Sequence, residues 1–575
     1  MSTYLFSLIA TACLLFYVTY QALWCSTRHL NYPPGPTKLP VIGNLLQMPK
    51  TRQWVKFREW ALEYGPIYHL KAGPDHLVVL NTPEATEELL VKRNRIFDDR
   101  MTMHVASEVL SAGQRMVFLA GSSLEYKVIR KELTSSLGPL PSREHQNVQE
   151  LEATVFLYDL LRHGSQTDIL MKGKTSEQEL LHDPEFLEQH WFSLVRRFAT
   201  SVVMLVMYGE RVERIKNNRS LHEIYEVVDN LTDCMLPGAF MADTLTFLQK
   251  LPDTLSPWRL KAQKMHRREL DVYGGFLDKI RADHESGVNR PDCFVGKYLK
   301  ARDSMIDRDQ VTSGRGLTSD GKWLRDILLA YSAGTVLEAG SDSTASTITS
   351  FVLFMLWYPQ VLEKAREEID KIVGAHRLPT FEDHENLPYV VAVIKEVLRC
   401  RPPAPLGVPH RSTEDTTYNG YFIPKGSVVI GNIWAIHLDP ACFEDPKEFN
   451  PDRWMGEIPV RWGGSGTGQT RDHYVFGWGR RFCMGSHIAE TSIFMVVARI
   501  LWGIEMRGPR NSRTGAVQLL DPWKEDSYST GAVTNAVPFN VVFEPRSSQH
   551  KEGIENAFRD AQDQWELLGL RKDER

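Results

Sequence analysis

The amino-acid sequence predicts a mainly helical protein with a small β-rich part. Helix patterns dominate, and the longest runs over residues 323–358 as a largely apolar stretch that Pro359 ends. Shorter amphipathic patterns follow over 362–373 and 387–400. Short strand patterns bounded by Gly and Pro lie near 66–80 and 417–433. With 42% hydrophobic residues among 575, the chain has ample material for a large buried core.

Composition and charge argue against several classes of protein. The formal net charge is −5, so nothing indicates the basic stripe of a nucleic-acid-binding surface. None of the seven cysteines forms a CxxC pair, which disfavours a zinc ribbon or a thioredoxin-like site. Their odd, sparse count also disfavours a disulfide scaffold and is typical of a chain that faces the reducing cytosol.

The N-terminal segment predicts a membrane anchor. No charged side chain occurs from Ser2 to Thr27, and Tyr4 to Trp24 is mostly apolar, which is long enough to span a bilayer as a helix. Positive charge follows the span and does not precede it, which places the N-terminus in the lumen and the body in the cytosol. The alternative is a cleaved signal peptide, which would normally carry a basic start and a shorter apolar core.

The rest of the chain divides by composition. We expect an anchor over 1–27, a proline-rich hinge over 28–48, a catalytic domain over 49–545 and a charged helical tail over 546–575. Prolines fix φ and remove backbone donors, so the hinge is expected to be stiff. In the tail, apolar residues recur at intervals of four and three and predict a helix that docks on the body or stays loosely attached: Ile554, Phe558, Ala561, Trp565 and Leu568.

The sequence predicts three further features of the body: a hairpin, a buried central helix and a loop. A Gly73-Pro-Asp75 turn separates two expected strands, 66–70 and 76–80. The long helix over 323–358 carries Glu338 and Asp342 at its middle, and charges there are costly in lipid. We therefore expect a buried central helix rather than a second membrane span. A Gly-rich stretch over 456–468 is expected to be a loop.

The segment Phe476-Gly-Trp-Gly-Arg-Arg-Phe-Cys-Met-Gly485 is the strongest chemical signal in the chain. Its glycines allow the backbone to turn tightly around Cys483. Nearby amides and the start of a helix would favour the thiolate, and Arg481 is placed to pair with an anionic group. Taken alone, a single cysteine is more often a buried apolar filler, so the pattern around it decides the interpretation.

This pattern resembles the haem-binding motif of the cytochrome P-450 superfamily, Phe-x-x-Gly-x-Arg-x-Cys-x-Gly. The resemblance implies the cytochrome P-450 fold, with haem between the long central helix and the cysteine loop and with Cys483 as the iron ligand. Glu396-Val-Leu-Arg399 and the Arg453 of Phe449-Asn-Pro-Asp-Arg-Trp454 are similar to two further family motifs. In the family these three charged residues form a buried structural triad behind the haem.

A second matching segment, Ala339-Gly-Ser-Asp-Ser-Thr344, is similar to the family's oxygen-activation pattern. The resemblance implies that Ala339 and Gly340 leave room for dioxygen over the iron. Asp342 and Ser343 would relay protons, and Thr344 is a second hydroxyl that could share that task. Serine stands where threonine is usual and lacks the methyl group that restrains the rotamer. The alternative is a structural helix kink made by Gly and Ser.

The resemblance also assigns the remaining contacts of the haem. The propionates need cationic or donor partners, for which it implies Arg100, His410 and Arg481. A Trp-Arg-x-x-Arg stretch of many relatives is best matched by Tyr126-Lys-Val-Ile-Arg130, which adds Tyr126 and Arg130. The full set of expected cofactor-binding residues is Arg100, Tyr126, Arg130, Ala339, His410, Phe476, Arg481, Cys483 and Gly485.

The resemblance implies a monooxygenase that inserts one atom of O2 into an apolar organic substrate. The run over 408–437 looks like fungal members of secondary metabolism. Electrons would come from NADPH through a separate flavoprotein reductase, which would dock near Lys127 and Lys131. The resemblance also implies that the protein is anchored in the endoplasmic reticulum membrane by a single transmembrane span. Two alternatives remain open: a haem-thiolate isomerase or dehydratase, and a non-catalytic haem sensor. Candidate pocket residues are Met101, Met103, Phe118, Phe240, Met241 and Phe247.

Overall fold

The computed structural model describes residues 11–12, 15–17, 19, 30–40, 42–163, 190–215, 218–236, 238–288, 290–456, 472–510 and 516–570. The longer helices are α2 (Gln53–Tyr64), α5 (Leu124–Leu137), α6 (Gln146–His163), α10 (Trp191–Tyr208), α11 (Arg219–Met235), α13 (Pro257–Glu285), α14 (Phe294–Asp303), α16 (Asp326–Trp357), α17 (Pro359–Ile372), α18 (Pro388–Cys400), α20 (Ser486–Gly503) and α21 (Ser548–Leu567). Short helices include α3 (Pro83–Thr86), α4 (Asn94–Phe97), η2 (His104–Leu110), η3 (Met116–Phe118), α12 (Met241–Thr244), α15 (Asp309–Thr312), α19 (Ile433–His437) and η11 (Gly479–Arg481).

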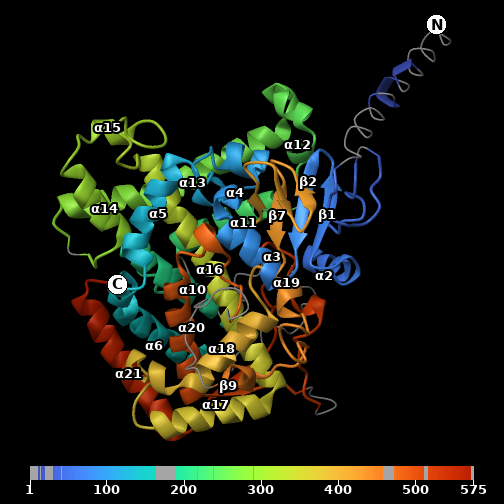
Figure 1. The fold of residues 1–575 in the computed structure, drawn as a ribbon. Coiled ribbons are helices and arrows are strands. Elements are labelled where there is room, and N and C mark those ends of the chain that lie inside the picture. Colours follow the sequence, from blue (N-terminus) through green and yellow to red (C-terminus); the bar gives the residue numbers. More distant parts are fainter. Residues whose placement is uncertain are drawn as a thin grey trace.

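The long central helix α16 organises the helical part (Figure 1). It packs against α10, α13, α18 and α20, and most of its length is buried. The helix begins at Asp326 rather than at 323, because Leu324 pairs with Leu317 in a β-bridge just before it. Pro359 ends it, as expected, and starts α17 at an angle of 108°.

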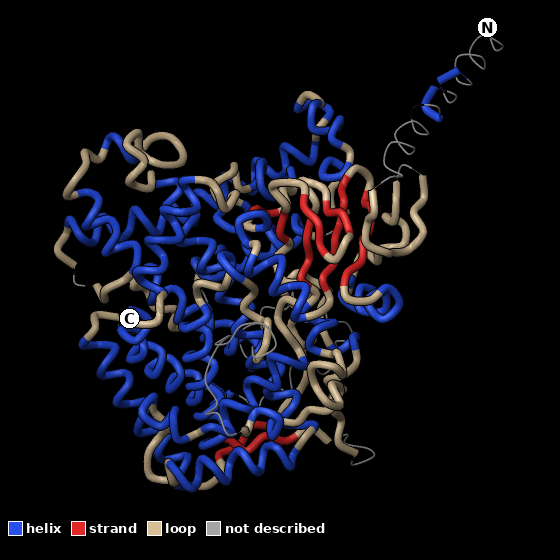
Figure 2. The backbone as a smooth tube through the Cα atoms, in the orientation of Figure 1, coloured by secondary structure: helices blue, strands red, loops and turns tan. Residues whose placement is uncertain are grey.

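The β-rich part is a five-stranded sheet of order β1-β2-β7-β4-β3 beside the helical body (Figure 2). Its strands are β1 (Ile67–Ala72), β2 (Asp75–Leu80), β3 (Asp99–Arg100), β4 (His410–Arg411) and β7 (Val428–Gly431). The expected first hairpin is confirmed, with Ala72 opposite Asp75 at the turn. Two further pairs are β5 (Thr416–Tyr418) with β6 (Tyr421–Ile423), and β8 (Ile504–Arg507) with β9 (Val542–Pro545).

The proline-rich hinge lies along the edge strand β1. The amide of His69 donates to the carbonyl of Pro34 at 2.7 Å, and the amide of Asn44 donates to the carbonyl of Lys71 at 2.6 Å. These bonds occupy backbone groups that an edge strand would otherwise leave open. The hinge is therefore docked on the body over this part of its length.

Helix α21 lies against α6 (Figure 1). The face expected from the sequence makes the contact: Phe558 stacks on Tyr158 at 3.8 Å between ring centroids, and Trp565 is fully buried. The guanidinium of Arg211 lies over the Trp565 ring at 4.5 Å. Of the two outcomes expected for the tail, this segment takes the docked one.

Among the described residues, one helix, α10, is long and apolar enough to cross a membrane, and the bent pair α16–α17 passes the same test together. Since α10 is 83% buried in its most apolar window and packs on α16, it is an interior helix of the body. The expected N-terminal anchor lies mostly outside the described residues. Nearly all of the expected Gly-rich loop over 456–468 does so as well.

Candidate functional site

Cys483 sits in a tight backbone turn just before α20. Its amide donates to the carbonyl of Phe476 at 2.8 Å, which closes the turn. Gly477 and Gly479 have φ of 76° and 51°, a left-handed conformation that favours glycine. At Gly479 a Cβ atom would also lie 2.4 Å from the carbonyl oxygen of Leu90, so no other residue fits there. The glycines expected from the motif thus have a physical cause.

The thiol of Cys483 is exposed although it lies deep in the protein. Burial raises its pKa, while hydrogen bonds from the amides of Gly485 and Ser486 act in the opposite direction. These amides open α20, whose N-terminus carries partial positive charge. At the buried Cys400, by contrast, burial dominates the pKa, and the groups that oppose it are arginines rather than amides. The surroundings of Cys483 therefore suit a thiolate that binds a metal from one open side.

Ala339 is the exposed residue on the buried middle of α16. Its neighbour Gly340 serves another purpose than the expected one. A Cβ atom at Gly340 would lie 2.6 Å from a methyl carbon of Val203, so this glycine lets α16 and α10 approach closely. Free space therefore lies at Ala339, and the expectation that Gly340 makes room for dioxygen is wrong.

Asp342 is paired with a residue that the sequence did not single out. Arg196 of α10 donates to its carboxylate at 2.8 Å and also stacks on the Tyr225 ring at 3.8 Å. Burial lowers the pKa of Arg196, but Asp342, Tyr225 and Asp229 together outweigh this effect and the net shift is upward. The hydroxyl of Ser343 donates to the carbonyl of Ala339 at 2.7 Å, and Thr344 is buried.

Two arginines, Arg100 and Arg481, meet His410 at the edge of the sheet. Burial and the neighbouring Arg481 lower the pKa of Arg100 to about 9. Burial, Arg100 and Arg481 lower the pKa of His410 as well. Within the part of the chain that the structure describes, neither Arg100 nor His410 forms an ion pair, and the Arg100 Nε atom is buried without a partner. This surplus of positive charge fits an anionic group such as a haem propionate.

Tyr126 and Arg130 lie beside this group, but Tyr126 acts differently from what the sequence predicts. Its hydroxyl donates to the carbonyl of Arg480 at 2.9 Å, and its ring lies under the guanidinium of Arg481 at 3.8 Å. Arg130 reaches the same hydroxyl at 3.4 Å. Tyr126 therefore supports Arg481, and its donor is engaged within the protein.

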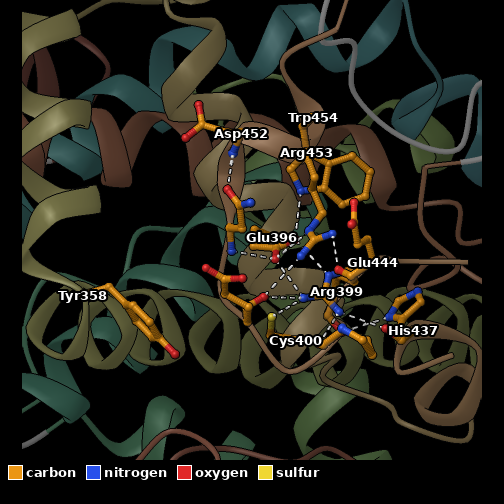
Figure 3. A network of polar contacts seen from close by, with 12 residues as sticks. Tyr358, Glu396, Arg399, Cys400, His437, Glu444, Asp452, Arg453 and Trp454 are labelled. Carbon is orange, nitrogen blue, oxygen red and sulfur yellow. Dashed lines mark hydrogen bonds and ion pairs between the residues drawn. The ribbon is translucent and has the colours of Figure 1, made fainter. Parts of the chain in front are cut away.

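Glu396, Arg399 and Arg453, here called the Glu396 triad, form one network (Figure 3). Glu396 receives two bonds from Arg399, at 2.7 and 2.9 Å, and one from Arg453 at 3.0 Å. The sequence missed the indole of Trp454, which donates to the same carboxylate at 3.0 Å. Arg399 also donates to the carbonyl of His437 at 2.9 Å. The triad joins α18 to the segment before the cysteine loop.

The candidate pocket residues lie in three different environments. Met103, Phe118 and Phe240 pack into one apolar cluster between η2, α11 and α13. Met241 and Phe247 are exposed on the surface, each at 62%. The remaining candidate, Met101, packs against the sheet. An apolar side chain alone did not distinguish these environments, because helix faces and loops expose some large apolar residues in every protein.

Comparison with solved structures shows the fold. A zebrafish cytochrome P450, solved with abiraterone, superposes with a TM-score of 0.63 at 22% identity and covers 86% of this chain and 100% of its own. The Cys483 turn, the central helix and the triad thus belong to the cytochrome P450 fold.

The family model for cytochrome P450 matches residues 33–511, and the chain belongs to this family. Cytochrome P450 monooxygenase 69 of Postia placenta is 43% identical over 99% of this chain and 98% of its own length. Cytochrome P450 monooxygenase verL of Clonostachys rogersoniana is 32% identical, with 98% and 96% covered, and fogE of Aspergillus ruber is 32% identical, with 94% and 92% covered. The family implies haem with a cysteine thiolate ligand.

Proposed function

We propose that the protein is a haem-thiolate monooxygenase that inserts one atom of O2 into an apolar organic substrate of fungal secondary metabolism. The observation that carries the proposal is the exposed, amide-supported thiol of Cys483 beneath a central helix that bares Ala339 and holds Asp342. The similarity to the fungal cytochrome P450 monooxygenases verL and fogE supports the reaction class, and the run over 408–437 supports the substrate class.

The residues of the chain divide the work. Cys483 would ligate the iron, and Phe476 and Gly485 would shape the turn around it. Arg100, His410 and Arg481 would hold the propionates. Tyr126 and Arg130 would support Arg481 from behind. When bound, the haem supplies the activation of dioxygen, which the thiolate promotes. The protein's own task is to place substrate and to deliver protons.

Proton delivery is proposed to run through Asp342. Its pairing with Arg196, which is partly exposed and also near Asp229 at 3.5 Å, connects the inner face of α16 with solvent. Asp342 would first take a proton from solvent, and rotation of the protonated carboxyl away from Arg196 would then carry that proton inward. Ser343, whose hydroxyl now donates to Ala339, would accept it and pass it on, and Thr344 lies one residue further along.

Electrons are proposed to come from NADPH through a separate flavoprotein reductase, with Lys127 and Lys131 on its docking side. We propose that residues 1–27 anchor the protein in the endoplasmic reticulum membrane as a single pass and leave the catalytic domain (49–545) in the cytosol, joined by the hinge (28–48) and followed by the helical tail (546–575). Glycosylation mapping and carbonate extraction of full-length and 28–575 proteins test this arrangement.

The visible spectrum of the reduced protein with carbon monoxide tests the central proposal, in wild type and in Cys483→Ala. A strongly red-shifted Soret band that the substitution abolishes is expected for thiolate ligation. A band of the histidine-ligated kind that survives the substitution contradicts it. Turnover with NADPH, reductase and ¹⁸O2 then separates the alternatives: label in the product indicates monooxygenation, whereas a haem-thiolate isomerase leaves the product unlabelled.

A further inference from the structure

A second buried ion cluster lies beside Ala339, and none of the sequence motifs accounts for it. Arg115, in the loop after η2, contacts Glu338 of α16 through both carboxylate oxygens and Glu269 of α13 at 2.7 Å. All three side chains are buried, with exposed fractions of 0%, 7% and 1%. We call these three residues the Arg115 cluster. It joins three elements that the chain otherwise keeps far apart in sequence.

Two tyrosines complete the hydrogen bonding of the Arg115 cluster. The hydroxyl of Tyr273 donates to Glu338, and the hydroxyl of Tyr331 donates to Glu269 at 2.8 Å. Tyr273 can lie against α16 because residue 334 is glycine: a Cβ atom there would be 2.6 Å from the tyrosine ring. Both carboxylates are thus fully engaged, and the packing that allows this is built into the helix.

The charges of the Arg115 cluster do not balance. Two carboxylates share one guanidinium, which leaves one uncompensated negative charge in a buried site unless one carboxyl keeps a proton. Burial raises the pKa of Glu269 to about 7, with Arg115 lowering it and Glu338 raising it. Glu269 therefore holds a proton up to about neutral pH. The two glutamates compete for a single cation, as in paired carboxylates elsewhere.

The titratable side chains named next surround Glu269 and do not change the conclusion that Glu269 holds the proton. Tyr331 and Tyr273 face it as hydroxyl donors, and burial keeps their pKa values above the usual range. Cys234 of α11 lies nearby, and burial raises its pKa to about 11. His266 touches Tyr331 at 2.7 Å and the carbonyl of Leu110 at 2.8 Å, and burial lowers its pKa. Of these groups, His266 is the rival whose titration must be separated by experiment.

We propose that Arg115 is a positioning residue that, with Glu269 and Glu338, holds the wall segment 104–118 against α13 and α16, and that the proton on Glu269 sets how firmly this wall closes. The wall contains Phe118, and the carbonyl of Leu119, directly after the wall, accepts a hydrogen bond from Arg481 at 2.5 Å, so the wall adjoins the proposed haem site. This consequence for access rests on the proposed function, whereas the cluster itself does not.

The sign of the effect follows from the charge. Loss of the proton from Glu269 as pH rises through its pKa adds a second buried negative charge beside a single guanidinium. The wall is therefore tight at low pH and loosens as pH rises. Glu269→Gln removes the titration and keeps a neutral group of the same shape, so it is expected to hold the wall in its tight form at every pH.

Hydrogen exchange of backbone amides in 104–118, measured on the haem-loaded full chain and corrected for the intrinsic rate, tests the proposal. Between about pH 6 and about pH 8, exchange in wild type is expected to rise about fivefold or more, the size of an ordinary coupling. In Glu269→Gln the rise is expected to vanish. A rise of the same size in wild type and Glu269→Gln overturns the proposal.

Two matched variants identify the group responsible. Glu152 is equally buried between Arg197 and Arg211 but lies on α6, away from the wall, so Glu152→Gln is expected to keep the wild-type profile. His266→Asn is expected to keep it as well. If Glu152→Gln removes the rise of exchange with pH, the rise reflects the stability of the whole protein. If only His266→Asn removes it, the titrating group is His266. Either result overturns the proposal.

Recombination of carbon monoxide after photolysis measures access to the iron without turnover. Its rate is expected to follow the exchange profile, rising with pH in wild type and staying constant in Glu269→Gln. A rate that ignores pH in both proteins overturns the claim that the wall controls access. Since exchange of 104–118 needs neither thiolate ligation nor oxygenation, a failure of the proposed function would leave the exchange result unchanged and is distinguishable from a failure of this inference.

Discussion

Two buried ion clusters stabilise separate parts of the molecule, and the proportions of their charges are reversed. The Glu396 triad has one carboxylate for two guanidinium groups, whereas the Arg115 cluster has two carboxylates for one guanidinium. Both are nearly free of solvent. What differs is the nature of the groups that absorb the surplus charge.

In the Glu396 triad, backbone carbonyls take up the surplus positive charge. Arg399 donates to the carbonyls of His437 and Pro446 at 2.9 and 2.8 Å, and Arg453 donates to that of Glu444 at 2.9 Å. Carbonyls do not titrate, so this network is fixed at every ordinary pH. The Arg115 cluster instead relies on a proton and two hydroxyls, which can leave or turn. The comparison teaches that a cluster with surplus positive charge gives a contact that does not change with pH. A cluster with surplus negative charge gives a contact that changes with its protonation.

The largest expected effect comes from removing the single carboxylate of the triad. Glu396→Ala leaves Arg399 buried with no counter-ion, and breaking a buried pair in this way costs about 3–5 kcal/mol. The variant is expected to yield little soluble, haem-loaded protein at any pH, as measured by urea unfolding and the yield of the carbon monoxide complex. Glu505→Ala, at a partly exposed pair with Arg366, is the control and is expected to stay soluble.

The second effect is smaller because a proton can relieve it. Arg115→Met leaves Glu269 and Glu338 without a cation, so both are expected to hold protons at low pH. A raised pKa in the folded state stabilises it at low pH, and this contribution is lost as pH rises toward that pKa. The deficit in unfolding free energy relative to wild type should therefore grow with pH, by at most about 1.4 kcal/mol per pH unit for each proton.

Urea unfolding of Arg115→Met and wild type at several pH values between about 5 and 8 measures this slope. A deficit that is constant with pH would mean that the Arg115 cluster is as rigid as the Glu396 triad, and the contrast between them would be lost. Glu396→Ala, where it can be folded, is expected to give the constant deficit, since its unpaired groups are arginines that stay charged throughout.

The two clusters were not equally visible in the sequence. Glu396, Arg399 and Arg453 lie in short motifs that resemble those of a known family, so the resemblance predicted the triad. Arg115, Glu269 and Glu338 come from a loop and two helices separated by up to 223 positions, and no local pattern links them. For the same reason the sequence missed Arg196, the partner of Asp342. Local motifs predicted the cysteine turn and the elements of the fold, while pairings between distant segments had to come from packing.

Asp342 and Arg196 form a third ion pair on α16, which is partly exposed. Substitutions in this pair test whether it also works through a change of protonation. Asp342→Asn keeps the shape and loses the ionisable group, so turnover is expected to fall on the order of 100-fold, the usual contribution of a proton-transfer residue. The carbon monoxide spectrum should be unchanged. Arg196→Lys, which preserves the charge, is expected to retain most activity; an equal loss there would point to packing on Tyr225 instead.

The smallest expected effect concerns Ser343, one residue beyond Asp342. Its hydroxyl donates to the Ala339 carbonyl and lacks the methyl group that restrains a threonine rotamer. Ser343→Thr is expected to lower the fraction of NADPH oxidised without product by about two- to fivefold, which corresponds to a rotamer preference of about 0.5–1 kcal/mol. The ratio of product to NADPH consumed measures it, with Ser343→Ala as the variant that should raise the wasted fraction. If Ser343→Thr leaves the ratio unchanged, Thr344 or water carries the proton, and rotamer freedom at 343 has no bearing on delivery.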